Sequence, residues 1–174
     1  IGEKIMIQYC KRCCLPSTKP HLSFDEEGIC NACRNYENRK NVDWDERKKE
    51  LMEILDRYRS KDGSNWDCII PVSGGKDSTY QVITMLELGM NPLCVTATTC
   101  DLTDIGRRNI ENIKKMGVDY IEVTTNRVVR AKLNRIGLTE VGDISWPEHV
   151  SIFTVPVRMA VNFNVPLIIW GENS

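Results

Sequence analysis

The chain has 174 residues, which allows one domain and a small additional module. Its 41% hydrophobic and 27% charged content is typical of a globular protein. The formal net charge of −1 lacks the basic excess that favours binding to nucleic acid, so nucleic acid is disfavoured as a partner. No apolar stretch approaches the roughly 20 residues of a membrane helix, and the N-terminus carries no signal peptide. We therefore expect a cytoplasmic protein with no membrane partner.

Five of the eight cysteines are concentrated between residues 10 and 33. Four of them form two C-x2-C pairs with sixteen residues between the pairs: Cys10, Cys13, Cys30 and Cys33. This spacing is typical of zinc sites, and four thiolates suit tetrahedral zinc. A disulfide arrangement would conflict with a reducing compartment. We predict a closed, structural zinc site, for which Cys14 or His21 remain alternative ligands.

The sequence divides into three stretches. Residues 1–42 have little periodicity and are predicted to form a zinc-ribbon module. Residues 43–64 are predicted to form a linking helix, because apolar side chains recur at helical spacing after Asp43, which is a suitable N-cap. Residues 65–174 alternate short apolar runs with amphipathic segments, which is typical of an α/β domain.

The α/β stretch predicts a Rossmann-like parallel sheet with flanking helices. Strands are expected at residues 68–72, 93–98, 120–123 and 165–170, and helices at 77–88, 105–116, 126–136 and 149–163. Gly137 is expected to end the third of these helices. Short connections between alternating strands and helices favour right-handed crossovers and a parallel sheet. Because the chain stops directly after the fourth predicted strand, we expect the C-terminal part of the domain to be missing.

The sequence Ser73-Gly74-Gly75-Lys76-Asp77-Ser78 follows the first predicted strand and opens a helix. Two glycines permit a tight turn and close approach of a phosphate to the backbone. The unpaired N–H groups at a helix N-terminus bind anions, and the two serine hydroxyls and the Lys76 ammonium add donors. The spacing matches neither a Walker A loop nor a dinucleotide-binding fingerprint. We interpret the six residues as a phosphate-binding loop.

This loop resembles the SGGxDS signature of the PP-loop ATP pyrophosphatases. That family includes the synthetases of GMP, argininosuccinate and NAD, and the tRNA-thiolating enzymes. The resemblance implies that residues 73–78 grip the pyrophosphate part of ATP and that ATP is split into AMP and pyrophosphate. It also implies that adenine lies near the end of the second strand, where Thr98 is the candidate contact.

A narrower resemblance covers nearly the whole chain. Several segments are similar to the N-acetyl sugar amidotransferases, which act in the biosynthesis of surface polysaccharide, O-antigen and pseudaminic or legionaminic acid: residues 9–13, 15–18, 24–33, 106–109, 116–119 and 166–173. The resemblance implies that ATP adenylates the acetamido oxygen of a sugar or nucleotide sugar. Ammonia then displaces AMP and leaves an acetamidino group. No Cys-His glutaminase constellation is visible, so a separate glutaminase subunit is the expected source of ammonia.

Four residues are candidates for catalysis: Lys76, Asp77, Glu172 and Asn173. Glu172 and Asn173 follow the fourth predicted strand, and ligands bind at this edge of open α/β sheets. Gly171 is expected to contact the nucleotide there. The phosphates need Mg²⁺ to offset their charge, with Asp77 as one candidate ligand. Arginines that could instead meet a phosphate or a sugar carboxylate are Arg107, Arg108 and Arg158.

Two other functions remain open. A tRNA-modifying, thiolation-type PP-loop enzyme would predict a basic face and a catalytic cysteine pair. Cys100 follows the second strand, but no basic neighbour is present to lower its pKa. A non-catalytic zinc-ribbon and nucleotide-binding module would predict a degenerate loop, whereas residues 73–78 are intact.

Overall fold

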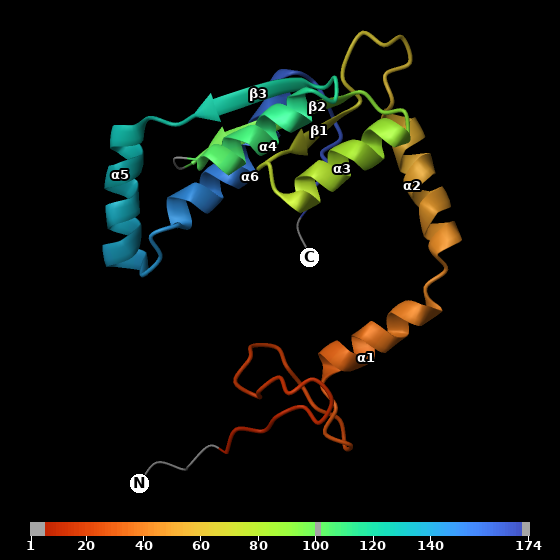
Figure 1. Ribbon diagram of the computed structural model, residues 1–174, viewed down its shortest axis with the longest axis vertical. Helices are drawn as coiled ribbons and strands as arrows, with labels where there is room; N and C mark the ends of the chain where they lie inside the picture. The colour runs from red at the N-terminus through yellow and green to blue at the C-terminus, as the bar shows by residue number, and fades with distance from the viewer. Residues whose placement is uncertain (1–5, 100–101, 172–174) are drawn as a thin grey trace. The chain divides into compact units, whose positions relative to one another are not determined.

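The computed structural model describes residues 6–99 and 102–171 (Figure 1). The chain forms two compact units, Ile1–Leu51 and Met52–Ser174. The boundary between them falls within helix α2 (Trp44–Tyr58). Each unit is described separately below.

The first unit is built on short irregular segments around the clustered cysteines. Two isolated antiparallel bridges, Tyr9 with Pro16 and Phe24 with Cys30, bring its segments together. Helix α1 (Asn31–Asn38) and the 3₁₀ turn η1 (Arg39–Asn41) follow. The predicted N-cap at Asp43 is confirmed, since its Oδ1 accepts the backbone N–H groups of Asp45 and Glu46. Sequence periodicity did not predict α1, because the helix buries no residue.

The second unit contains a parallel sheet in the order β1-β2-β3. Its strands are β1 (Cys68–Pro71), β2 (Pro92–Thr98) and β3 (Asp119–Thr124). The register pairs Ile69 with Leu93 and Val95 with Ile121. The predicted parallel α/β fold is confirmed. Strands β1 and β2 are apolar and mostly buried because helices cover both faces, whereas β3 at the edge is only partly buried.

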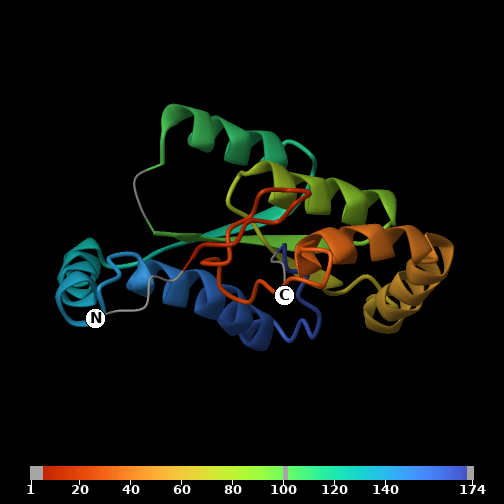
Figure 2. The same cartoon turned by 90° about the horizontal axis from the view of Figure 1, so that it is seen from below.

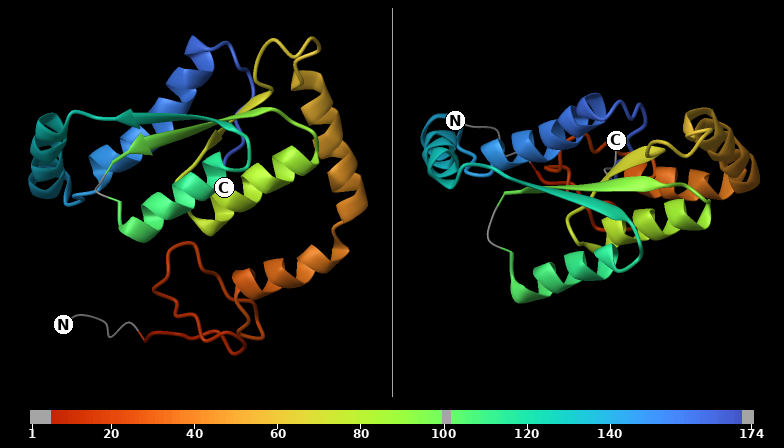
Figure 3. Two further views of the ribbon diagram at one scale, coloured as in Figure 1. Left: turned by 45° about the horizontal axis from the view of Figure 1, so that its top comes forward. Right: turned by 90° about the horizontal axis from the view of Figure 1, so that it is seen from above.

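Helices lie on both sides of this sheet (Figures 2 and 3). Helices α3 (Lys76–Glu87) and α4 (Asp104–Lys114) cover one face, and α6 (Trp146–Asn162) covers the other. Helix α5 (Arg127–Ile136) contacts α6. The core is centred on Ile69, Leu93, Val95 and Val165. Within the described part of the chain, no helix has the length and apolar character required to cross a bilayer.

The predicted fourth strand is reduced to a single bridge between Ile69 and Ile168. Ile69 donates its N–H to the Leu167 carbonyl and accepts the N–H of Ile169, each over 2.9 Å. Pro166 has no N–H to donate, so it cannot extend this ladder toward the N-terminus. The segment therefore lies beside β1, in parallel, without forming a longer strand.

The predicted end of α5 is confirmed, since the helix ends at Ile136 with Gly137 as its C-cap. Gly137 keeps a right-handed helical conformation and opens a π-helical turn, η2 (Gly137–Val141), that the sequence did not predict. This turn ends at Gly142, whose φ of 78° is left-handed. A Cβ at Gly137 would lie 2.7 Å from the Asp143 carbonyl oxygen, which explains the glycine by packing.

Candidate functional site

The loop between β1 and α3 has the geometry of an anion-binding turn. Gly74 adopts a φ of 78°, and a Cβ there would lie 3.2 Å from Ile110 Cγ1 on α4. Gly75 precedes α3 in an extended conformation, and no side chain caps this helix. The first N–H groups of α3 therefore have neither an intrahelical acceptor nor a capping side chain. The dipole of the helix places a partial positive charge at the same end.

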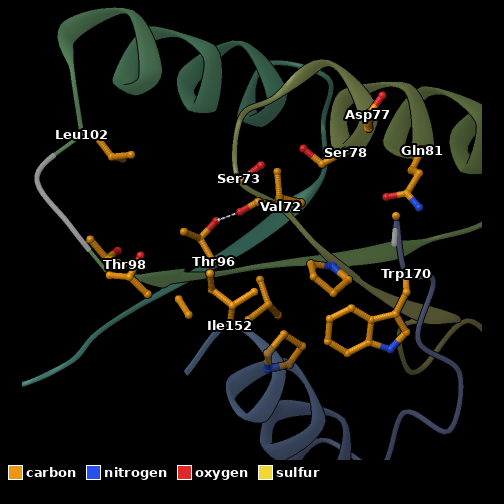
Figure 4. Close-up of a pocket in the computed structure, with 16 residues that line it drawn as sticks. Val72, Ser73, Asp77, Ser78, Gln81, Thr96, Thr98, Leu102, Ile152 and Trp170 are labelled. Carbon is orange, nitrogen blue, oxygen red and sulfur yellow. Dashed lines mark hydrogen bonds between the residues drawn. The ribbon is translucent and has the colours of Figure 1, made fainter. Parts of the chain in front are cut away.

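A cavity of about 370 Å³ opens beside this loop. It is bordered by Ser73, Asp77 and Ser78 from the loop and α3, and by the carboxyl end of β2 from Val95 to Thr99. In Figure 4, Ser73, Ser78 and Gln81 lie on the α3 side, and Ile152 and Trp170 lie on the opposite side. The cavity thus lies at the edge of a parallel sheet where open α/β folds bind their ligands.

The two serines of the loop differ in their surroundings. Ser78 is buried and donates its hydroxyl to the Gly75 carbonyl over 3.1 Å. Ser73 is exposed, and its Oγ accepts the Gly75 N–H over 3.4 Å. Ser78 therefore braces the turn, whereas Ser73 presents a hydroxyl that can exchange its weak contact for a ligand oxygen.

Lys76 and Asp77 form an ion pair with 2.7 Å between Nζ and Oδ1. Their side chains are 89% and 74% exposed. Lys76 does not border the cavity, and the Asp77 carboxylate points away from Thr96 and Ile152 (Figure 4). The geometry leaves both side chains free to turn toward a bound phosphate, since an exposed pair of this kind contributes little energy.

Thr98 and Gly171 both border the cavity, although they lie far apart in the sequence. The Thr98 hydroxyl donates to Glu122 Oε1 over 2.7 Å, so its orientation is held by β3. Gly171 lies against Gln81, and a Cβ there would approach Gln81 Oε1 to 3.0 Å. The Oε1 atom of Gln81 is buried and has no hydrogen-bond partner among the described residues. Gln81 is a ligand candidate that sequence motifs did not indicate.

The predicted residues Glu172 and Asn173 lie outside the described residues, as does Cys100. Asp77 is the carboxylate that the described part of the cavity offers for Mg²⁺. Ser73 and Thr98 offer hydroxyl oxygens in the same cavity, and oxygen ligands suit a hard cation such as Mg²⁺. These side chains would supply part of the coordination shell, and phosphate oxygens would supply the rest.

A second hollow, of about 470 Å³, adjoins the first and shares Thr98, Thr99 and Leu102 with it. Arg107 borders this hollow and contacts both oxygens of Glu122, over 3.1 and 3.0 Å. Arg107 thus lies near the predicted phosphate region but is held by a carboxylate. Arg108 and Arg158 are exposed and border neither cavity.

The four predicted zinc ligands come together in the first unit. The Sγ atoms of Cys10, Cys13, Cys30 and Cys33 all lie within 4.8 Å of one another. The pairs Cys10–Cys33 and Cys13–Cys30 are separated by 4.0 and 3.5 Å. A tetrahedral site with Zn–S bonds of about 2.3 Å requires S–S distances of about 3.8 Å, so the cluster fits zinc. The alternatives Cys14 and His21 are not in this group.

Backbone hydrogen bonds around the cluster favour a thiolate. The N–H groups of Cys13 and Arg12 lower the pKa of Cys10 to about 6, against the opposing effect of burial. The pKa of Cys33 is raised to about 12, first by its hydrogen bond with Cys13 and then by burial. One thiolate with protonated neighbours is the charge state expected of four thiols crowded together without a cation. A divalent metal would displace the remaining protons.

Two cysteines of the sheet have no such environment. Burial raises the pKa of Cys68 and of Cys94 to about 12. Both side chains are fully buried in the core. The interpretation of Cys68 as a small buried hydrophobe is confirmed, and neither thiol is suited to nucleophilic attack.

Comparisons with known proteins identify solved structures that share this fold. No protein-family model matches the chain. The NMN synthetase of Francisella tularensis is similar in structure, with a TM-score of 0.54, 14% identity, and coverage of 74% of this chain and 54% of that chain. The NH3-dependent NAD synthetase of Campylobacter jejuni, in complex with the nitrate ion, gives a TM-score of 0.56, 13% identity, and coverage of 76% and 58%.

An uncharacterized protein of Methanocaldococcus jannaschii is 31% identical over 99 residues, which are 56% of this chain and 35% of that protein. The chain therefore spans about a third of this curated relative and little more than half of the two synthetases. At these identities the structural likeness shows that the chain shares the fold of the synthetases. NAD synthetases are among the PP-loop enzymes that the Ser73–Ser78 loop resembles, so loop and fold agree.

Proposed function

We propose that the protein is an ATP-dependent amidotransferase of the PP-loop type that converts the acetamido group of an N-acetyl sugar into an acetamidino group. The observation that carries this proposal is the cavity beside the Ser73–Ser78 loop at the carboxyl edge of the parallel sheet. Ser73, Asp77 and Ser78 border this cavity, whereas Gly74 and Gly75 form the adjoining turn that leads into the uncapped N-terminus of α3, in a fold shared with NAD and NMN synthetases.

The proposed reaction has two steps. The acetamido oxygen attacks the α-phosphorus of ATP, and the bond to the β-phosphate oxygen breaks to release pyrophosphate. Ammonia then attacks the activated carbon and loses one proton to solvent, and the C–O bond breaks. The former acetamido oxygen leaves as part of AMP, and the carbon retains a C=N bond. Each step needs charge stabilisation on phosphate oxygens more than covalent participation by the protein.

Each loop residue has a separate role in this scheme. The first turn of α3 and the glycine turn before it would receive the pyrophosphate, because the first N–H groups of α3 have neither an intrahelical acceptor nor a capping side chain. Ser73 and Lys76 would donate to phosphate oxygens, and Lys76 would exchange its exposed pairing with Asp77 for them. Thr98 and the neighbouring end of β2 would border the adenine.

Magnesium supplies charge neutralisation of the phosphates when it is bound. Asp77 would hold it once Lys76 has turned to the phosphates, and Glu172 and Asn173 remain further candidates from the same sheet edge. The four cysteines would hold a zinc ion with a purely structural role, because all four coordination positions are filled by protein sulfur.

The sugar substrate and the ammonia source rest on the sequence resemblance. Segments that contain the clustered cysteines, and others after α3, are similar to the N-acetyl sugar amidotransferases. We propose that ammonia comes from a separate glutaminase partner, since the described residues contain no paired Cys and His that would form a glutaminase site.

An isotope experiment tests the proposal. Full-length protein is incubated with MgATP, ammonium and N-acetyl sugars labelled with ¹⁸O in the acetamido group, and the products are analysed by mass spectrometry. We expect AMP that carries the label, together with pyrophosphate and an acetamidino sugar. Unlabelled AMP formed only with tRNA would favour tRNA modification instead. ADP as the product contradicts a pyrophosphatase, and zinc retention without nucleotide binding indicates a non-catalytic module.

A further inference from the structure

The second hollow contains a buried cation that has no carboxylate partner among the described residues. Arg130, in the first turns of α5, is 8% exposed and borders the hollow. Its Nη2 donates to Thr125 Oγ1 over 3.0 Å and to Ser151 Oγ over 2.7 Å. Its Nη1 is buried and has no hydrogen-bond partner among the described residues. The interactions found for this guanidinium are thus with neutral hydroxyl groups.

Other charges in the hollow do not compensate Arg130. Glu122 is held by Arg107 and by the Thr98 hydroxyl. Glu148 lies on α6 and accepts Asn134 Nδ2 over 3.3 Å. Neither carboxylate forms an ion pair with Arg130 in the described structure. Among the described residues, the glutamates that line the hollow are Glu122 and Glu148, and each has a partner other than Arg130.

A guanidinium that is buried without an anionic partner destabilises the folded protein. Withdrawing a cation from water costs several kcal/mol unless an anion or a full set of acceptors replaces the water. Guanidinium also offers a planar fork that suits the two oxygens of a carboxylate or phosphate. Arg130 Nη1 therefore offers an unused charged donor to an oxyanion that enters the hollow.

The position of the hollow indicates what that oxyanion belongs to. The hollow and the nucleotide cavity share Thr98, Thr99 and Leu102, and β3 ends in the hollow at Thr124. A molecule held by Arg130 would thus lie alongside a nucleotide bound at the Ser73–Ser78 loop.

We propose that the Arg130 hollow binds an oxyanion of the acceptor substrate and so selects anionic over neutral N-acetyl sugars. The identification of the bound molecule as the acceptor rests on the proposed function, whereas binding of the oxyanion rests on the hollow itself. The oxyanion is either a sugar carboxylate or the phosphate of a nucleotide sugar, which share the same recognition by guanidinium.

The test measures binding and turnover separately. Isothermal titration of the full-length protein, without ATP, uses three probes: N-acetylneuraminate for the carboxylate, UDP-N-acetylglucosamine for the phosphate, and neutral N-acetylglucosamine. We expect at least one anionic probe to bind about tenfold or more tightly than the neutral probe, because a charge-assisted hydrogen bond is lost without it. The preferred anion identifies the source of the oxyanion.

Variants of one helix decide the role of Arg130. Arg130→Gln should remove the preference for the anionic probe, about tenfold or more, and leave ATP binding unchanged. The exposed Arg135 lies on the same helix, and Arg135→Gln should change neither. Arg130→Lys keeps the charge without the fork and should weaken the anion preference while keeping the fold. If both Arg130 variants fold and keep the wild-type preference, Arg130 only ties α5 to α6 and the proposal is wrong.

Failure of the two proposals can be told apart. If the isotope experiment yields no AMP while Arg130→Gln still loses anion binding, the hollow is an oxyanion site and the amidotransferase function is wrong. If AMP and acetamidino sugar form and the ratio of kcat/KM for anionic and neutral sugars is the same in wild type and Arg130→Gln, the hollow does not select the acceptor. Should Arg130→Gln not fold, the anion preference of Arg130→Lys decides, and an unchanged preference overturns the proposal.

Discussion

The two compact units of this chain are stabilised by different means. In residues 6–51, the buried hydrophobic residues are Cys10 and Cys30, both members of the four-thiol cluster. The second unit buries a contiguous apolar core between its helices and sheet, centred on Ile69, Leu93, Val95 and Val165. Cross-linking by metal can replace a core in a short segment, whereas a nucleotide cavity needs a rigid sheet edge. The two units should therefore respond independently to mutation.

The largest effect is expected from Cys30→Ser. Loss of one ligand should abolish tight zinc binding and, with it, on the order of 10 kcal/mol of folding free energy of the first unit. Metal analysis should show less than one zinc per chain, and limited proteolysis should cut within residues 6–51 while the second unit stays resistant. Cys14→Ser is the matched control, since Cys14 is exposed and outside the cluster. Equal zinc content in both variants would contradict a zinc site made of the four clustered cysteines.

A core substitution should affect only the second unit. Leu93 is fully buried in the middle of the sheet, so Leu93→Ala should lower the free energy of unfolding by about 2–5 kcal/mol through lost burial and a residual cavity. Chemical denaturation gives the shift, with the exposed Leu138→Ala as control at about 0.5 kcal/mol or less. Zinc content should stay at wild type. Loss of zinc in Leu93→Ala would show that the units are coupled.

Two glycine substitutions should distinguish the effect of backbone strain from the effect of crowding at the phosphate-binding loop. Gly63→Ala and Gly74→Ala both place a side chain at positive φ, at a cost of about 1–2 kcal/mol. A Cβ at Gly63 meets nothing within 4 Å, whereas one at Gly74 meets Ile110 and Asn109 of α4. Both variants should lose similar stability from strain, with more lost by Gly74→Ala. Only Gly74→Ala should weaken ATP binding, as measured by calorimetry. Equal ATP affinity in both would count against a phosphate role for the loop.

The smallest effect is expected at Glu122. The Thr98 hydroxyl, followed by Arg107, lowers the pKa of this carboxyl below its ordinary value. A depressed folded-state pKa adds stability above the unfolded-state pKa and loses it as the pH falls through the folded-state pKa. Glu122→Gln should thus lower stability at neutral pH, by about 1 kcal/mol or less, and flatten the decline in acid. Melting temperatures of wild type and Glu122→Gln, measured from pH 7 to pH 3, give this difference in stability. An unchanged acid slope would show that the pair is not formed in solution.

Local sequence patterns predicted the elements that depend on local interactions. Strands β1, β2 and β3 were indicated by apolar runs, and helices α2 to α6 by helical spacing, with their ends shifted by a few residues. Asp43 was recognised as a cap because its contacts reach only three residues ahead. The four cysteines were recognised because C-x2-C spacing itself places two thiolates around one metal.

Features that depend on distant partners were not predictable in this way. The predicted fourth strand is only a single bridge to Ile69, because Pro166 has no N–H with which to extend the ladder. Gly137 ends α5 as predicted, but the π-helical turn after it and the close Asp143 carbonyl depend on how the chain folds back. Gln81 and Arg130 carry no motif, and their unpaired buried atoms become visible only when helices are packed on the sheet.

The amino-acid sequence by itself determined the parallel α/β class, the phosphate-type loop at residues 73–78 and the thiolate set for zinc, because each follows from spacing along the chain. The tertiary structure alone decided how these parts become a site. It turned Lys76 and Asp77 outward, brought Thr98 and Gly171 to one cavity, and enclosed Arg130 among neutral partners in the adjoining hollow. The physical reason is that burial and charge balance depend on neighbours contributed by α4, β3 and α6, which no local pattern specifies.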